Sequence, residues 1–106
     1  MMSKEYIEPK NVREMIDEIG DVLMRADNGE LSVSNAASNI VCSTIANNSC
    51  DYHEIIERYP DLGVLVEKCA DIEAEYDVIT DPAIKHMFDL QWYAVHKLHE
   101  KLDKLV

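Results

Sequence analysis

The sequence predicts an all-α fold, a compact antiparallel bundle of four main helices plus one short helix. Apolar residues recur every three or four positions along most of the chain, as on the buried face of an amphipathic helix. Sustained strand-like alternation does not occur, and only three Gly and three Pro interrupt the 106 residues. The periodic segments are joined by a few residues each, which favours antiparallel neighbours.

The first two helices are expected over residues 9–27 and 33–47. The apolar residues of each follow helical spacing, so they share one face. The turn-forming run Asp27-Asn28-Gly29 stops the first helix. Ser32 or Ser34 can cap the second with a side-chain oxygen.

The other three helices are expected over residues 51–59, 61–78 and 82–105. Pro60 ends the short helix because proline does not continue a helix, and Asp61 can cap the next one. Asp81 followed by Pro82 is a cap with proline at the first helical position. The last helix then carries apolar residues at alternating spacings of four and three.

We expect residues 9–106 to form one helical-bundle domain and residues 1–8 to form a flexible N-terminal tail. A chain of this length buries enough surface for one core without a metal or disulfide scaffold. Three cysteines at irregular spacing are typical of reduced thiols, which predicts a cytoplasmic location. No apolar run approaches the roughly 18 residues of a membrane span, so no membrane partner is expected.

The charge is strongly acidic and unevenly distributed. The chain has 21 Asp and Glu against 10 Lys and Arg, a formal net charge of -11, which argues against binding a nucleic-acid backbone. Residues 61–81 carry a net charge of -6, whereas residues 82–106 carry +1. The twenty residues from Leu31 to Cys50 carry no charge at all. This uncharged segment predicts a central helix, a helix that meets a partner, or a polar exposed helix.

Four residues are candidates for an interface. Ser38 and Ser43 are small side chains in the uncharged segment that permit close approach of another helix. Gln91 is a polar residue in the apolar seam of the last helix, where one such position can fix the register of a helix pair. Trp92 lies at the edge of that seam and suits packing against another helix.

A second group is a candidate metal or polar site on the last helix. His96, His99 and Asp103 are spaced i, i+3, i+7, so an imidazole pair and a carboxylate share one edge. Zinc uses such ligands, and Cys50-x-x-His53 offers more, although histidines at such an edge also form hydrogen bonds between helices. Glu73 falls on the apolar side of its helix, where it is either buried with a raised pKa or exposed at a rotated helix end.

Acidic stripes are the remaining candidates. Four carboxylates of the first helix share one face, which points away from the core and suits either solvent or Mg²⁺: Glu14, Asp17, Glu18 and Asp21. Pairs three apart invite comparison with the all-α nucleotide pyrophosphohydrolases of the MazG type, which bind Mg²⁺ through such carboxylates. The pairs are Glu18/Asp21, Glu54/Glu57 and Glu100/Asp103. Their order and spacing do not reproduce that family's motif, so the chain is not assigned to it.

These observations predict a small acidic helical interaction or regulatory module that acts by binding a protein partner or itself, in the latter case as a homodimer, without catalysis or a cofactor. No Gly-rich phosphate loop, His-Glu-x-x-His or Gly-x-Ser-x-Gly motif occurs in the sequence. The alternative is a metal-dependent all-α hydrolase that acts on a nucleotide.

Overall fold

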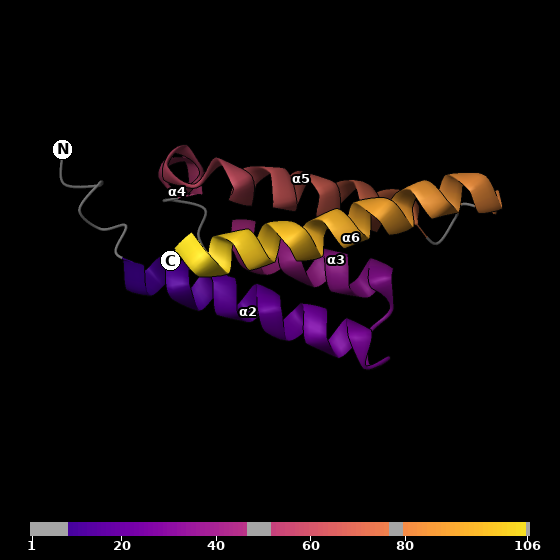
Figure 1. The fold of residues 1–106 in the computed structure, drawn as a ribbon, viewed down its shortest axis with the longest axis horizontal. Coiled ribbons are helices and arrows are strands. Elements are labelled where there is room, and N and C mark those ends of the chain that lie inside the picture. The colour runs from indigo at the N-terminus through magenta and orange to yellow at the C-terminus, as the bar shows by residue number, and fades with distance from the viewer. Residues whose placement is uncertain (1–8, 47–51, 77–79, 106) are drawn as a thin grey trace.

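Four helices pack around a shared apolar core in the computed structural model of the chain (Figure 1). The structure describes residues 9–46, 52–76 and 80–105. Its helical elements are α2 (Pro9–Asp27), α3 (Val33–Val41), the π-helical segment η1 (Cys42–Ala46), α4 (Tyr52–Arg58), α5 (Pro60–Glu75) and α6 (Pro82–Leu105). In the order α2, α3, α5, α6, each main helix packs against the next, and α6 closes the ring against α2. The predicted all-α bundle is confirmed.

The observed helix ends lie close to the predicted ones. Helices α2 and α6 have the predicted bounds. The second helix continues only to Val41 as an α-helix and then widens into η1. Helix α5 begins one residue early, at Pro60, and ends at Glu75. The expected tail, residues 1–8, and the predicted end at residue 78 fall outside the described residues.

Gly29 ends α2 with backbone hydrogen bonds that satisfy the last carbonyl groups of the helix. Its φ angle is +79°, a left-handed conformation that glycine adopts without a steric cost. The Gly29 amide donates to the Ala26 carbonyl at 3.1 Å, and the Glu30 amide donates to the Arg25 carbonyl at 2.9 Å. This pair of bonds is a Schellman motif, which turns the chain toward α3.

Side-chain caps begin α3 and α6 as predicted. The Ser32 hydroxyl accepts a hydrogen bond from the Asn35 amide at 3.1 Å, and the Asp81 carboxylate accepts one from the Ala83 amide at 2.9 Å. The predicted cap at Asp61 is wrong, because α5 already begins at Pro60. Asp61 lies in the first turn and instead forms an ion pair with Lys101 of α6 at 2.9 Å.

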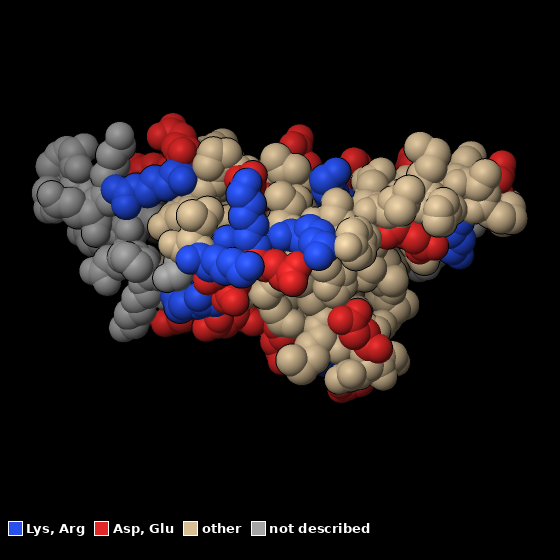
Figure 2. All heavy atoms as spheres, in the orientation of Figure 1, with Lys and Arg blue, Asp and Glu red and all other residues tan. Residues whose placement is uncertain are grey.

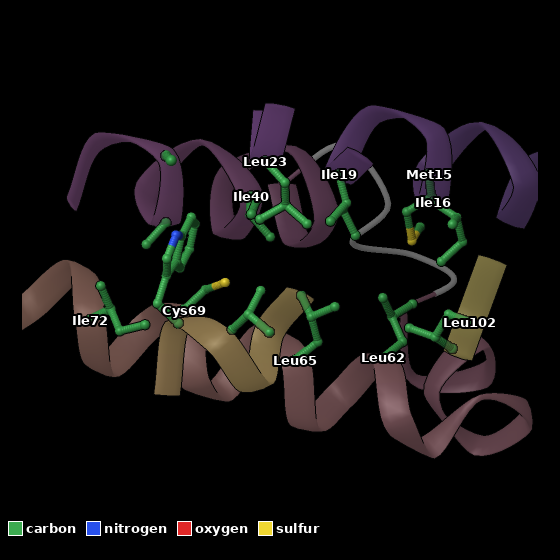
Figure 3. Close-up of a cluster of buried hydrophobic side chains, with 14 of the residues drawn as sticks. Met15, Ile16, Ile19, Leu23, Ile40, Leu62, Leu65, Cys69, Ile72 and Leu102 are labelled. Carbon is green, nitrogen blue, oxygen red and sulfur yellow. The ribbon is translucent and has the colours of Figure 1, made fainter. Parts of the chain in front are cut away.

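The core lies between α2 and α5, the two helices that stand on opposite sides of the bundle. Figure 3 shows Ile16 and Ile19 of α2 pointing toward Leu62 and Leu65 of α5, with Ile40 of α3 among them. All five side chains are completely buried. Burying each of these side chains contributes about 1.5–3 kcal/mol to the free energy of folding. These contacts therefore stabilise the packing of the helices against one another.

The uncharged helix α3 is not central, contrary to the first interpretation of its composition. It packs against α2 and α5 on one face only, through Ala36, Ala37 and Ile40. The opposite face is exposed at Asn35 and Asn39. Serine and asparagine satisfy their hydrogen bonds in water, so this outer face is polar without being charged.

The first turns of α6 extend beyond the ends of α2 and α3 (Figure 1). From Thr80 to Met87 every residue is exposed except Lys85, which is half-buried. Tyr76 supports this overhang, because its hydroxyl donates to Asp89 at 2.8 Å and its ring lies 4.8 Å from the Lys85 ammonium. None of the described helices is long and apolar enough to cross a membrane.

Candidate functional site

The seam between α2 and α6 contains the two histidines that the sequence analysis selected. A surface pocket of about 560 Å³ opens along this seam. Residues from both helices line it: Gly20, Leu23, Met24, Asp27, Tyr93, His96, Lys97, His99 and Glu100. The pocket is open to solvent. Its possible function therefore depends on whether its polar side chains are free to bind a ligand or are engaged in contacts between α2 and α6.

His99 joins α6 to the backbone of α2. Its Nε2 lies 2.9 Å from the Ile16 carbonyl oxygen, so the tautomer with a proton on Nε2 donates a hydrogen bond across the seam. Gly20 makes this approach possible, because a Cβ atom at that position would lie 2.9 Å from the same nitrogen. The imidazole is therefore engaged in helix packing.

Asp103 is held by a cation from α2. The Arg13 guanidinium bonds both the Asp103 carboxylate and its backbone carbonyl, and it also pairs with Asp17 at 2.7 Å. Hydrogen bonding from Arg13 lowers the pKa of Asp103, and the same contacts raise the pKa of Arg13. One oxygen of the exposed carboxylate is thus paired with an arginine at the end of the seam.

Replacing Asp103 is expected to change the pH dependence of stability. A carboxyl group whose pKa is lowered by folding stabilises the native state at neutral pH, and the contribution is lost as the pH falls through that lowered pKa. Asp103→Asn should therefore shift the urea midpoint more at pH 7 than at pH 3. In an Arg13→Gln background the shift should be small at both pH values; an unchanged shift there would contradict the role of Arg13.

His96 faces the other end of the pocket. Its Nε2 lies 3.6 Å from the Asp27 carboxylate, and its ring meets Trp92 edge-on at 5.5 Å between centroids. Asp27 is the last residue of α2, so this contact joins the end of α2 to the middle of α6.

The structure does not gather the candidate metal ligands into one set. His96, His99 and Asp103 each contact a different group of α2, while Glu73 lies exposed on α5. Among the described residues, no three His, Cys, Asp or Glu side chains are grouped closely enough to hold a metal ion. Cys50, proposed with His53 as a further ligand, lies outside the described residues, and His53 is exposed.

Glu73 lies close enough to Cys69 for its charge to raise the pKa of the Cys69 thiol. The thiol is buried in the core, and burial, with a smaller contribution from the nearby Glu73 charge, raises its pKa to about 12. A thiol in this state remains protonated at neutral pH, so it acts as a small apolar side chain and not as a nucleophile.

The four interface candidates occupy different environments. Ser38 and Ser43 are half-buried, and the Ser43 hydroxyl donates to the Ile40 carbonyl at 3.3 Å. Gln91 is half-buried on α6. Trp92 belongs to the core, with only 9% of its surface exposed, so its ring is not available to a partner.

The apolar side chains on the outer side of α6 were not among the candidates predicted from the sequence. Met87, Leu90 and Tyr93 are 60%, 55% and 59% exposed. The signal was present as a second heptad pattern, displaced by about a third of a turn from the core seam. Its positions are Met87, Leu90, Ala94, Lys97, Lys101 and Lys104. We call these six residues the outer stripe.

The outer stripe borders a groove between α5 and α6. The groove has a volume of about 410 Å³, and Val64 and Lys68 of α5 form its far wall. Figure 2 shows Lys and Arg gathered over the C-terminal half of α6 and a largely uncharged surface over its N-terminal half. Contiguous apolar surface that is exposed to solvent is typical of sites that bind another molecule.

The chain has no significant match to a protein-family model, to a curated protein or to a solved structure.

Proposed function

We propose that this protein is a small acidic helical interaction or regulatory module. It acts by binding a protein partner or itself and performs no catalysis. The observation that carries the proposal is the exposed apolar part of the outer stripe, Met87 and Leu90, with Tyr93 beside it. Monomeric proteins rarely expose contiguous apolar patches of more than a few hundred Å², and larger patches mark interaction sites.

The polar groups of the α2–α6 seam support a structural role over catalysis. His99 is bonded to the Ile16 carbonyl and Asp103 to Arg13, so neither is poised to act on a substrate. No comparable observation among the described residues favours the alternative, a metal-dependent hydrolase that acts on a nucleotide. A cytoplasmic location is part of the proposal and is supported by Cys42 and Cys69, which form no disulfide.

Photo-crosslinking in the native host tests the proposal. A benzoylphenylalanine at Tyr93, beside the outer stripe, should yield a crosslinked species of defined mass on irradiation. The same residue at Glu14, on the exposed acidic face of α2, is the matched control and should yield little. A product with twice the mass of 12.1 kDa identifies self-association, and another mass identifies a different protein. Equal, diffuse labelling from both positions would contradict the proposal.

A further inference from the structure

We propose that the occupant of the outer stripe is a second copy of this chain, bound with the two α6 helices antiparallel. The inference rests on the proposed function and names its partner. It follows from two features of one face of the molecule: the arrangement of apolar and basic residues along α6, and the arrangement of charges along the adjoining side of α5.

The outer stripe changes from apolar to basic halfway along α6. Its first three positions, Met87, Leu90 and Ala94, are apolar, and its last three are lysines. Such a heptad pattern packs a helix against another helix at a shallow angle. If two copies were parallel, the lysines of one would lie against the lysines of the other. An antiparallel pair instead places the apolar halves together near Leu90 and moves the lysine halves apart.

Helix α5 supplies the acidic counterpart. Val64, Lys68, Asp71 and Glu75 follow spacings of four, three and four, so they share the side of α5 that borders the groove. Asp71 and Glu75 are exposed and lie at the end of α5 from which α6 departs. Asp81, exposed before the first turn of α6, adds a third carboxylate at this end.

One face of the molecule therefore has an acidic end, an apolar middle and a basic end. The acidic end holds Glu75 and Asp81, with Asp71 one turn further in, and the basic end holds Lys97, Lys101 and Lys104. Lys97 and Lys101 are exposed and also pair with Glu100 and Asp61 of the same chain. A two-fold axis near Leu90 brings the basic end of each copy to the acidic end of the other. The interface is then isologous: both copies use the same surface, and the contact between a basic end and an acidic end occurs twice.

The face is large enough for a specific dimer. Helix α6 has 24 residues, so it is about 36 Å long, and with α5 beside it the face is about 20 Å wide. A standard interface buries about 800 Å² on each partner. The flat outline of this face is about 700 Å², just under that size, and the relief of the side chains adds accessible area. An antiparallel pair therefore reaches that size only if it covers nearly the whole face.

Charge reversal on each end, followed by mixing, tests the arrangement. The basic-end variant is Lys97→Glu with Lys104→Glu, and the acidic-end variant is Asp71→Lys with Glu75→Lys. Wild-type protein at tens of micromolar should sediment at twice 12.1 kDa, and each variant alone should associate about tenfold or more weakly. An equimolar mixture should recover the dimer, because each copy then offers the charge that the other requires. Glu14→Lys with Glu18→Lys, the same charge change on the outer face of α2, should leave association unaltered.

A substitution in the apolar middle supplies an independent measurement. Leu90→Glu should abolish dimerisation, whereas Met24→Glu, at an equally exposed methionine of α2, should not. Circular dichroism on every variant shows that the helices remain folded. A wild-type monomer at these concentrations, or a mixture of charge variants that stays monomeric, overturns the dimer. A crosslink from position 93 to a different protein would then still support the proposed function, so the two failures are distinguishable.

Discussion

Leu65→Ala should lower the free energy of unfolding by about 3 kcal/mol. Leu65 is completely buried on α5 and faces Ile19 of α2 and Ile40 of α3 across the core (Figure 3). Truncation removes the transfer free energy of the leucine side chain and leaves a cavity that three helices cannot collapse into. Urea denaturation, with an unchanged slope and a lower midpoint, measures the loss.

Val64→Ala is the matched control one position away. Val64 is 41% exposed at the groove between α5 and α6, so its truncation should change stability by no more than about 0.5 kcal/mol. The measurements belong at a protein concentration below that of self-association, since dimerisation adds apparent stability. Similar losses for both substitutions would contradict the burial of Leu65 and the exposure of Val64.

Gly20→Ala should report on the contact between His99 and α2. Alanine is favoured over glycine inside a helix by about 1 kcal/mol, but a Cβ atom at Gly20 would lie 2.9 Å from His99 Nε2. The ring must then move away from the Ile16 carbonyl that it bonds. In a His99→Ala background this cost disappears. We expect a coupling free energy of about 1–2 kcal/mol between the two positions in a double-mutant cycle.

Gly63 supplies the comparison for this cycle. A Cβ atom there would lie 3.6 Å from Ile56, an ordinary van der Waals contact, so Gly63→Ala should stabilise the protein by up to about 1 kcal/mol. The gain should be the same with or without His99, because α5 does not share that contact. A Gly20→Ala gain of equal size in both backgrounds would show that His99 does not constrain α2.

Helix α6 carries two patterns at once. Its inner seam contributes Phe88, Val95 and Leu102 to the core, while its outer stripe presents Met87 and Leu90 to solvent. A helix with apolar residues on two sides is typical of an element buried between neighbours. Within one chain, α2 and α5 cover only the inner seam. The apolar part of the outer stripe is therefore left exposed, and this exposure is the observation on which the proposed function rests.

Local chemistry made the helix boundaries predictable. Ser32 and Asp81 cap their helices with side-chain oxygens, and Gly29 takes the left-handed conformation that ends α2. Each of these capping interactions joins residues only a few positions apart, so it can be predicted from the local sequence. Asp61 was not predictable in this way, because its carboxylate could cap α5 or form an ion pair. Its pairing with Lys101 depends on how α5 lies against α6.

The candidate site was predictable only in part. Helical rotation correctly grouped His96, His99 and Asp103 along one edge of the last helix, the edge that faces α2. Their partners were not predictable, because Ile16 and Arg13 lie 83 and 90 positions away along the chain. Glu73 had two open environments, and the packing of α5 leaves it exposed.

The sequence by itself determined the all-α class, the bounds of α2 and α6 and the side of each helix that is apolar, since these depend on spacing and local hydrogen bonds. Only the tertiary structure decided which sides are covered. Helix α3 has a core face and a polar outer face, whereas α6 keeps an apolar stripe uncovered. Burial depends on neighbours distant in the chain, so the same spacing of apolar residues is compatible with a core or with an interface until the packing of the bundle is known.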